Sequence, residues 1–107
     1  MTGPRGLLLF MTDIDPASEA DFNRWYEEEH LPERMAIPGF ITARRFRAIE
    51  GTPKYLALYD LESSEVLQTE PYLRIVGANK SPWTKRMESK FIDGRRNVYT
   101  CILERKR

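Results

Sequence analysis

The order of the apolar segments is the feature that most constrains the fold of this chain. Four short runs are rich in aliphatic, aromatic and β-branched residues, as is typical of strands, and segments containing Pro, Gly and Asp separate them. Such residues commonly mark the ends of elements. The predicted strands cover residues 7–14, 40–49 and 54–60, and "NVYTCIL" within residues 91–103 forms the last one.

Helical signals fill the two longer intervals between these runs. Asp15 offers an N-cap oxygen and Pro16 is the favoured first helical residue, so we expect a helix over about residues 16–30. Residues 63–87 carry a second helical segment that two internal prolines break into short pieces. The resulting order, β-α-β-β-α-β, predicts an α+β ferredoxin-like fold, in which a four-stranded antiparallel sheet carries both helices on one face.

The predicted strands carry apolar side chains on both faces of the sheet. In the first strand, for example, Leu7 and Leu9 alternate with Leu8 and Phe10. Two short helices can cover only one face, and a sheet-sized apolar patch is unusual on a monomer. A second copy of the same sheet is the simplest cover, so we predict a homodimer with the two sheets face to face.

Length and charge narrow the class of protein. The 107 residues fit a single domain, spanning residues 1–107. The 17 basic and 16 acidic residues are intermixed and give a formal charge of +1, which favours neither a nucleic-acid partner nor a membrane surface. The run "GLLLFM" is too short to span a bilayer, and we expect a cytoplasmic protein. We expect the lone cysteine, Cys101, to be a small buried thiol.

Motifs for several kinds of chemistry are missing from the sequence. The stretch "KYLALYD" lacks the glycine and the paired aromatic residues of an RNA-binding strand. There is no Gly-rich phosphate loop, no G-x-S-x-G elbow and no Cys–His pair. One histidine with scattered glutamates lacks the spacing of a metal site. We therefore predict no metal and no cofactor, and we expect any chemistry to be non-covalent acid–base chemistry.

Four stretches resemble the EthD-like family of the dimeric α+β barrel superfamily, namely "NRWYEEEHLPERMAIPGF", "ARRFRA", "PKYLALYDLESSEVL" and "PYL". The resemblance covers roughly residues 7–73, and its most specific motif is the aromatic-rich helix that ends in "EEHLPE". It implies a ferredoxin-like subunit, a dimer whose sheets form a barrel, and a pocket between sheet and helices. The superfamily includes cofactor-independent monooxygenases, isomerases and cyclases acting on small aromatic or polyketide-like molecules, haem-degrading enzymes, and proteins of unknown activity.

His30, the only histidine, is the clearest candidate for proton transfer near neutral pH. Asn23, Tyr26 and His30 share one face of the predicted helix, and Trp25 and Glu29 lie on the adjoining face. If that face borders the pocket that the resemblance implies, His30 takes a proton from a phenol, an enol or a carbon acid, Glu29 orients it, and Tyr26 donates to the oxyanion. A structural alternative also fits, because a histidine at a helix C-terminus complements the dipole and caps carbonyl groups.

The predicted catalytic residues are therefore His30, Tyr26 and Glu29, and the ligand-binding candidates are Asn23, Trp25, Arg44, Phe46 and Tyr59. Two further arginines, Arg45 and Arg47, share a strand face and either receive a carboxylate or form salt bridges with the helix glutamates, the interpretation that we favour. Two functions remain open. One is a metal-free enzyme that isomerises, cyclises or oxygenates a small hydrophobic or aromatic metabolite, and the other is a non-catalytic dimeric binding protein.

Overall fold

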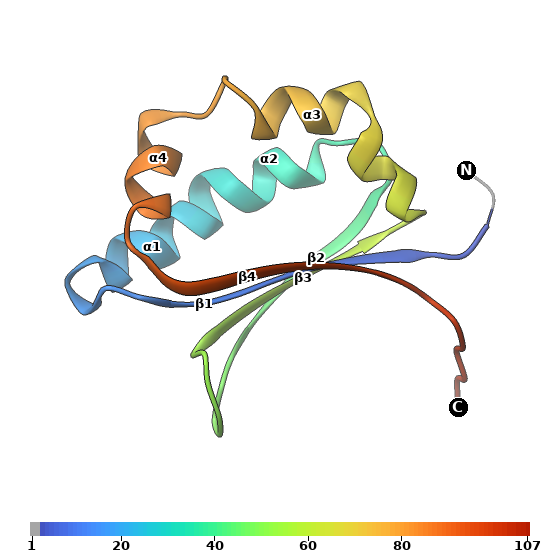
Figure 1. Cartoon of the computed structure of the whole chain (residues 1–107), viewed down its shortest axis with the longest axis horizontal. Coiled ribbons are helices and arrows are strands. Elements are labelled where there is room, and N and C mark those ends of the chain that lie inside the picture. The colour runs from blue at the N-terminus through green and yellow to red at the C-terminus, as the bar shows by residue number, and fades with distance from the viewer. Residues whose placement is uncertain (1–2) are drawn as a thin grey trace.

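The apolar runs form the strands of one antiparallel sheet in the computed structural model, which describes residues 3–107. The strands are β1 (Gly6–Ile14), β2 (Phe40–Arg47), β3 (Tyr55–Leu61) and β4 (Phe91–Thr100). Their order in the sheet is β2-β3-β1-β4, and each neighbouring pair is antiparallel. The helices all lie on one face of this sheet (Figure 1). The predicted α+β ferredoxin-like fold is therefore confirmed.

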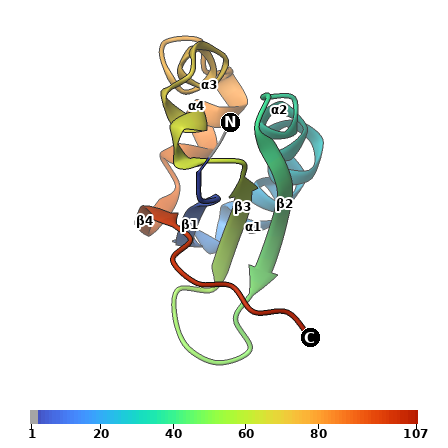
Figure 2. The ribbon, with the colours of Figure 1, turned by 90° about the vertical axis from the view of Figure 1, so that its right-hand side faces the viewer.

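The helical segments form two rows above the sheet. The first row follows β1 and contains η1 (Pro16–Ser18), α1 (Glu19–Trp25), η2 (Tyr26–His30) and α2 (Leu31–Met35). The second row follows β3 and contains η3 (Ser64–Gln68), α3 (Glu70–Val76) and α4 (Pro82–Glu88), so it is broken as predicted. Figure 2 shows the rows side by side, with α2 above β2 and with α3 and α4 on the side of β4. Within residues 3–107, no helix has both the length and the apolar character needed to cross a membrane.

The first row continues past His30, where the sequence pattern predicted the end of the helix. Leu31 donates its backbone N–H to the carbonyl of Tyr26, five residues earlier, and residues 26–30 form a π-turn. The wider turn suits Pro32, because a proline has no N–H to donate and its ring clashes with the carbonyl four residues back in a regular α-helix. His30 keeps helical backbone angles inside a continuous helical segment. The alternative in which His30 caps a helix C-terminus is therefore wrong.

The core lies between the sheet and the helices and is rich in aromatic residues. Phe22 has no exposed surface, and its ring centroid lies 5.1 Å from that of Tyr26 and 5.3 Å from that of Tyr55. In β3, every second side chain from Tyr55 to Leu61 is buried. This period of two identifies the face of the sheet that the helices cover. Removing these large apolar side chains from water is the main contribution to the stability of the fold.

The opposite face of the sheet, called the outer face below, is covered by no helix of the described residues (Figure 1). The strand register places apolar side chains from each strand on this face, including Leu9, Phe46, Leu58 and Tyr99. Phe46 and Tyr99 are 44% and 48% exposed. The outer face is thus a large, partly apolar surface of the kind that the homodimer prediction requires.

The last strand lies earlier in the sequence than the apolar pattern indicated. β4 ends at Thr100, where its partner in β1 is Gly6. Cys101 lies beyond the strand and is exposed, as are Ile102 and Leu103. The predictions of a strand reaching Leu103 and of a buried thiol at Cys101 are therefore wrong for the single chain. Apolar character alone does not reveal where the pairing stops. Here the backbone N–H of Cys101 still donates to the carbonyl of Arg5, the residue before β1, but the strand does not extend to Ile102 and Leu103.

Two glycines with left-handed backbone angles provide a matched test of packing around the sheet. Gly39, at φ +98°, precedes β2, and a Cβ there would lie 2.4 Å from Cγ2 of Val66. Gly51, at φ +94°, has open space around it. We predict that Gly39→Ala lowers the free energy of unfolding by about 1–3 kcal/mol more than Gly51→Ala, because overpacking adds to the backbone cost that both share. Urea unfolding of the two variants measures this difference, and equal losses would contradict the prediction.

Candidate functional site

A pocket of about 440 Å³ lies between the helix-covered face of the sheet and the two helical rows. Its volume falls within the range of roughly 300–1,000 Å³ that is typical of small-molecule sites. Much of the lining is aromatic and apolar, including Phe10 from β1, Trp25 from α1 and Phe91 from the start of β4. Of the residues singled out from the sequence, four line this pocket: Trp25, Tyr26, His30 and Tyr59.

The π-turn brings the aromatic side chains and the imidazole together. Trp25 and His30 are five residues apart, and in a regular α-helix of about 3.6 residues per turn they would point in different directions. Here their rings stack, with centroids 4.3 Å apart and an interplanar angle of 30°. Tyr26 meets His30 edge-on at 5.0 Å. The two helix faces that a regular helix would separate therefore form one wall of the pocket.

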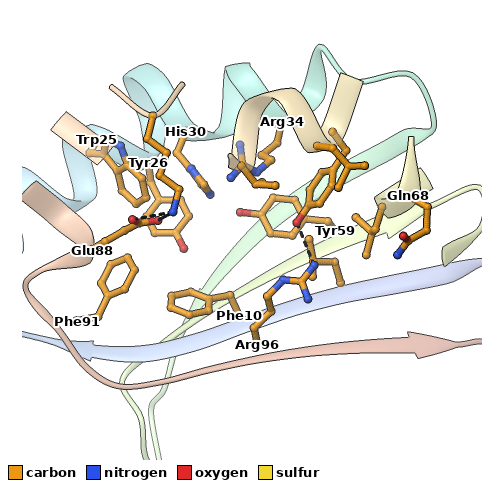
Figure 3. A pocket seen from close by; sticks show the side chains of 16 residues that line it. Phe10, Trp25, Tyr26, His30, Arg34, Tyr59, Gln68, Glu88, Phe91 and Arg96 are labelled. Atoms are coloured by element: carbon orange, nitrogen blue, oxygen red, sulfur yellow. Dashed lines mark hydrogen bonds and ion pairs between the residues drawn. The ribbon is translucent and has the colours of Figure 1, made fainter. Parts of the chain in front are cut away.

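Three polar groups meet in the middle of the pocket. Figure 3 shows the hydroxyl groups of Tyr26 and Tyr59 and the ring of His30 pointing into the same space, with Phe10 below them. Tyr59 comes from β3 and is almost fully buried. Nδ1 of His30 and the hydroxyl of Tyr59 are buried without a hydrogen-bond partner among the described residues. Unpaired buried polar groups are uncommon in folded proteins, and they are frequent at sites that act on a ligand.

Burial controls the protonation of these groups. It lowers the pKa of His30 well below its usual 6.5, and the positive charges of Arg34 and Arg45 lower it further. The imidazole is therefore neutral at pH 7 and has one lone pair and one N–H. Burial raises the pKa of Tyr26 to about 12, although Arg45 opposes this shift. Burial also raises the pKa of Tyr59 well above 10, so both phenols keep their protons and can donate hydrogen bonds.

Glu29 lies outside the lining of the pocket. Its Oε2 accepts hydrogen bonds from the indole N–H of Trp25 at 3.2 Å and from the hydroxyl groups of Ser81 at 2.6 Å and Thr84 at 3.0 Å. Ser81 is also the N-cap residue of α4. Glu29 therefore connects the first helical row to the start of α4 and holds the Trp25 ring, and it makes no contact with His30 of the kind that a base-orienting carboxylate requires.

Asn23 also lies outside the pocket lining, where it contacts an arginine. Its Oδ1 accepts a hydrogen bond of 2.9 Å from Arg45, whose guanidinium lies 4.1 Å from the centroid of the Tyr26 ring. Within residues 3–107, neither Arg45 nor Arg47 forms a salt bridge, and the favoured interpretation of ion pairs with the helix glutamates is wrong. The charge of Arg45 is instead stabilised against aromatic rings.

Arg44 and Phe46 lie on the outer face, on the side of the sheet away from the pocket. Their register partners in β3 are Leu58 and Leu56, which alternate with the buried residues of that strand. Arg44 forms a salt bridge of 3.1 Å with Asp60. The structure therefore does not bring these two predicted ligand-binding residues together with His30.

Several polar residues of the pocket were not singled out from the sequence. Arg34 follows His30 by four residues and belongs to the same helical face, a relationship that the expected helix end at His30 concealed. Tyr72 from α3 and Arg96 from β4 also line the pocket. No sequence signal points to Arg96, because its position follows only from the pairing of β4 with β1, which sets Arg96 opposite Phe10.

The described residues contain no group of three or more His, Cys, Asp or Glu side chains arranged to hold a metal ion. The polar side chains that line the pocket are an imidazole, an indole, phenols, an amide, two guanidinium groups, and the ion pair of Lys80 and Glu88. This donor set suits hydrogen bonding to oxygen atoms of an organic molecule.

The fold defines the class of this protein as ferredoxin-like, and similar crystal structures include dimeric members. One is a proposed antibiotic biosynthesis monooxygenase from Bordetella bronchiseptica, with a TM-score of 0.71, 18% identity, and coverage of 94% of this chain and 100% of that one. Another is a dimeric ferredoxin-like protein from an uncultured marine organism, with a TM-score of 0.71, 15% identity, and coverage of 99% of this chain and 94% of that one. A third is a mutant of SnoaB, a cofactor-independent oxygenase from Streptomyces nogalater, with a TM-score of 0.68, 12% identity, and coverage of 95% of this chain and 97% of that one. At these identities the similarity shows the fold alone.

The chain belongs to the family of the domain of unknown function DUF4286, whose sequence model matches residues 7–93. No curated protein matches the chain. The resemblance to the dimeric α+β barrel superfamily is thus supported at the level of the fold, and the narrower EthD-like assignment stays a prediction.

The lowered pKa of His30 makes stability depend on pH in a defined direction. As the pH falls through about 6.5, the unfolded chain takes up a proton at His30 that the folded protein does not. Stability is therefore lost below that pH, by at most about 1.4 kcal/mol per pH unit. We predict that the melting temperature of the wild type falls more steeply between about pH 7 and pH 5 than that of His30→Gln. The carboxylates are common to both proteins, so parallel curves in a thermal scan would contradict the prediction.

Proposed function

We propose that the chain is a one-domain homodimer that binds a small aromatic or otherwise hydrophobic molecule in this pocket and uses His30, without a cofactor, to remove a proton from it. One observation carries the proposal: among the largely aromatic walls of the pocket lie two buried polar atoms without partners, Nδ1 of His30 and the hydroxyl oxygen of Tyr59. Leaving such a group unpaired costs about 1–3 kcal/mol. A bound molecule with suitably placed oxygen atoms recovers this cost.

The proposed step breaks an acidic O–H or C–H bond of the substrate. Neutral His30 accepts the proton and becomes an imidazolium, and the electron pair of the broken bond stays on the substrate as a phenolate or enolate. An imidazolium beside Arg34 and Arg45 is unfavourable, but the substrate anion that forms at the same moment offsets this repulsion. The hydroxyl groups of Tyr26 and Tyr59 face the same space and donate hydrogen bonds to the new oxyanion (Figure 3).

We assign positioning roles to Glu29 and Asn23. Glu29 holds the indole of Trp25, whose ring stacks on the imidazole of His30. Asn23 holds Arg45 over the aromatic rings, and the charge of Arg45 adds to burial and to the charge of Arg34 in lowering the pKa of His30. Neither residue touches the substrate in this proposal, in contrast to the direct catalytic role first expected for Glu29.

One comparison supports chemistry without a cofactor, because the fold is similar to that of SnoaB, a cofactor-independent oxygenase. Isomerisation, cyclisation and oxygenation of an aromatic or enolic molecule can all begin with deprotonation.

The second candidate, a non-catalytic binding protein, is favoured by the strongly lowered pKa of His30, because an imidazole of low pKa is a weak base.

Hydrogen–deuterium exchange tests the proposed step without knowledge of the full reaction. A panel of small enolisable aromatic ketones is incubated with the protein in D₂O, and loss of the acidic C–H signal is followed by NMR. We predict catalysed exchange by the wild type and a rate lower by about 100-fold or more in His30→Gln, since general-base catalysis contributes factors of this size. Calorimetric binding of the same compound to His30→Gln serves as the control. An unchanged exchange rate would remove His30 as the base, and binding without exchange would favour the non-catalytic candidate.

The homodimer in the proposal rests on the outer face. Apolar side chains from the strands are exposed there in the single chain, and no described helix covers them. The similarity to a protein that is itself dimeric and ferredoxin-like supports a sheet-to-sheet assembly. A second copy of the same face is self-complementary and buries the apolar side chains of both subunits.

Light scattering after size exclusion measures the assembly directly. We predict a mass twice the 12.6 kDa of one chain for the wild type. Phe46→Glu, which places a charge on the outer face, is expected to give a monomer, because an unpaired charge in an interface is costly. Met35→Glu is the matched control, since Met35 is similarly exposed, at 40% against 44%, but belongs to α2. A monomeric wild type, or an unchanged dimer in Phe46→Glu, would contradict the assignment of this interface.

A further inference from the structure

The pocket has a second polar region, called the arginine end below, which consists of Arg34, Tyr72 and Arg96. The guanidinium of Arg96 donates a hydrogen bond of 3.0 Å to the hydroxyl of Tyr72. The guanidinium of Arg34 lies 5.9 Å from the centroid of the same ring. Figure 3 shows Arg34 reaching down from the helix and Arg96 reaching up from the sheet, to one side of Trp25 and Phe91. Tyr72 is buried, so one fixed ring orients both cations.

The charges of the pocket lining do not balance. Three cationic side chains, Arg34, Lys80 and Arg96, face one anionic side chain, Glu88. Lys80 and Glu88 neutralise each other, because Nζ of the lysine lies 3.0 Å from both carboxylate oxygens. Arg34 forms a salt bridge with Glu33, whereas Arg96 forms none within residues 3–107. The arginine end therefore presents positive charge that the described residues leave uncompensated.

The chemistry of this end suits a planar anion. A guanidinium presents N–H groups in a flat fork that matches the two oxygens of a carboxylate. The hydroxyl of Tyr72 accepts its hydrogen bond from Arg96 and still has its own proton to donate. The rest of the pocket differs, because its walls are mainly aromatic rings and its two remaining charged groups, Lys80 and Glu88, neutralise each other. A molecule that fits both regions has an aromatic body and one negative charge at its edge.

We propose that the pocket takes a small aromatic carboxylate, whose carboxylate group is bound by Arg96 and Arg34 and whose ring lies among the aromatic side chains. This inference rests on the proposed function, because it names the class of molecule for the same pocket. It also gives the arginine end a task in catalysis. A carboxylate held at that end fixes the direction of the ring and presents an oxygen on the opposite part of the molecule to His30 and Tyr59.

A matched pair of ligands distinguishes the contribution of the carboxylate to the binding affinity from that of the ring. 6-Hydroxy-2-naphthoic acid and its methyl ester have nearly the same shape, but only the acid is charged at pH 7. We expect isothermal titration calorimetry of the wild type to show about tenfold or tighter binding of the acid, as expected for hydrogen bonds to a charged group. Raising the ionic strength should weaken binding of the acid and leave that of the ester unchanged.

Two arginine variants locate the effect in the protein. Arg96→Gln should reduce the affinity for the acid by about tenfold or more and change that for the ester by less than about twofold. Arg74→Gln is the control, because it removes the same charge from a neighbouring exposed position on α3, where Arg74 pairs with Glu70 and does not line the pocket. This variant should bind both ligands as the wild type does. Arg96 is exposed, so its replacement leaves the core intact.

The outcomes distinguish this inference from the proposed function. Equal binding of acid and ester by the wild type would overturn the carboxylate assignment and leave the proposed aromatic pocket in place. Equal weakening of both ligands in Arg96→Gln would also overturn it, since it would indicate a structural effect. Tighter binding of 2-naphthyl phosphate than of the acid would replace the carboxylate with a phosphate. Binding of neither naphthalene compound to the wild type would count against both proposals.

Discussion

Pro32 cannot donate a backbone hydrogen bond, and the helix accommodates it with a wider turn. The backbone N–H of Leu31 donates to the carbonyl of Tyr26, five residues earlier. The pocket depends on this single wide turn. It stacks Trp25 on His30, and α2 then continues for another turn that carries an arginine to the pocket wall. In a regular α-helix the indole and the imidazole would lie on different sides, and the wall would have no continuous aromatic surface. A local irregularity in an otherwise regular helix thus creates the site, as π-turns often do.

The second contact that organises the molecule is the carboxylate of Glu29. One of its oxygens accepts hydrogen bonds from Trp25 on the first row and from Ser81 and Thr84 on the second. These donors belong to segments more than fifty residues apart in the sequence, and no apolar contact could fix their relative rotation as tightly as convergent hydrogen bonds do. The glutamate that looked like a partner of His30 therefore acts on the shape of the pocket through the indole.

The fold could be predicted from the sequence because strand patterns, caps and prolines are local signals that agree with one another. The site could be predicted only in part. Tyr26, His30, Trp25 and Tyr59 were found, but a period of 3.6 residues cannot anticipate a π-turn. The outward direction of Arg44 and Phe46 follows from the pairing of β2 with β3, which no single strand reveals. Arg96 reaches the pocket through its pairing with β1, a contact between segments that are distant in sequence.

The strict alternation of side chains in β3 has a consequence for how this protein can change. In β3, residues that face the helices and residues of the outer face follow one another at every step. Substitutions at odd and even positions therefore alter the pocket and the outer face independently, and a family with this fold can diversify its chemistry while its outer surface stays the same. A deletion or insertion of a single residue has the opposite effect, because it exchanges the two faces along the rest of the strand. The pairing of β1 with β4 and the pairing of β2 with β3 each absorb one extra residue at an irregularity, whereas the pairing of β1 with β3, in the middle of the sheet, contains none.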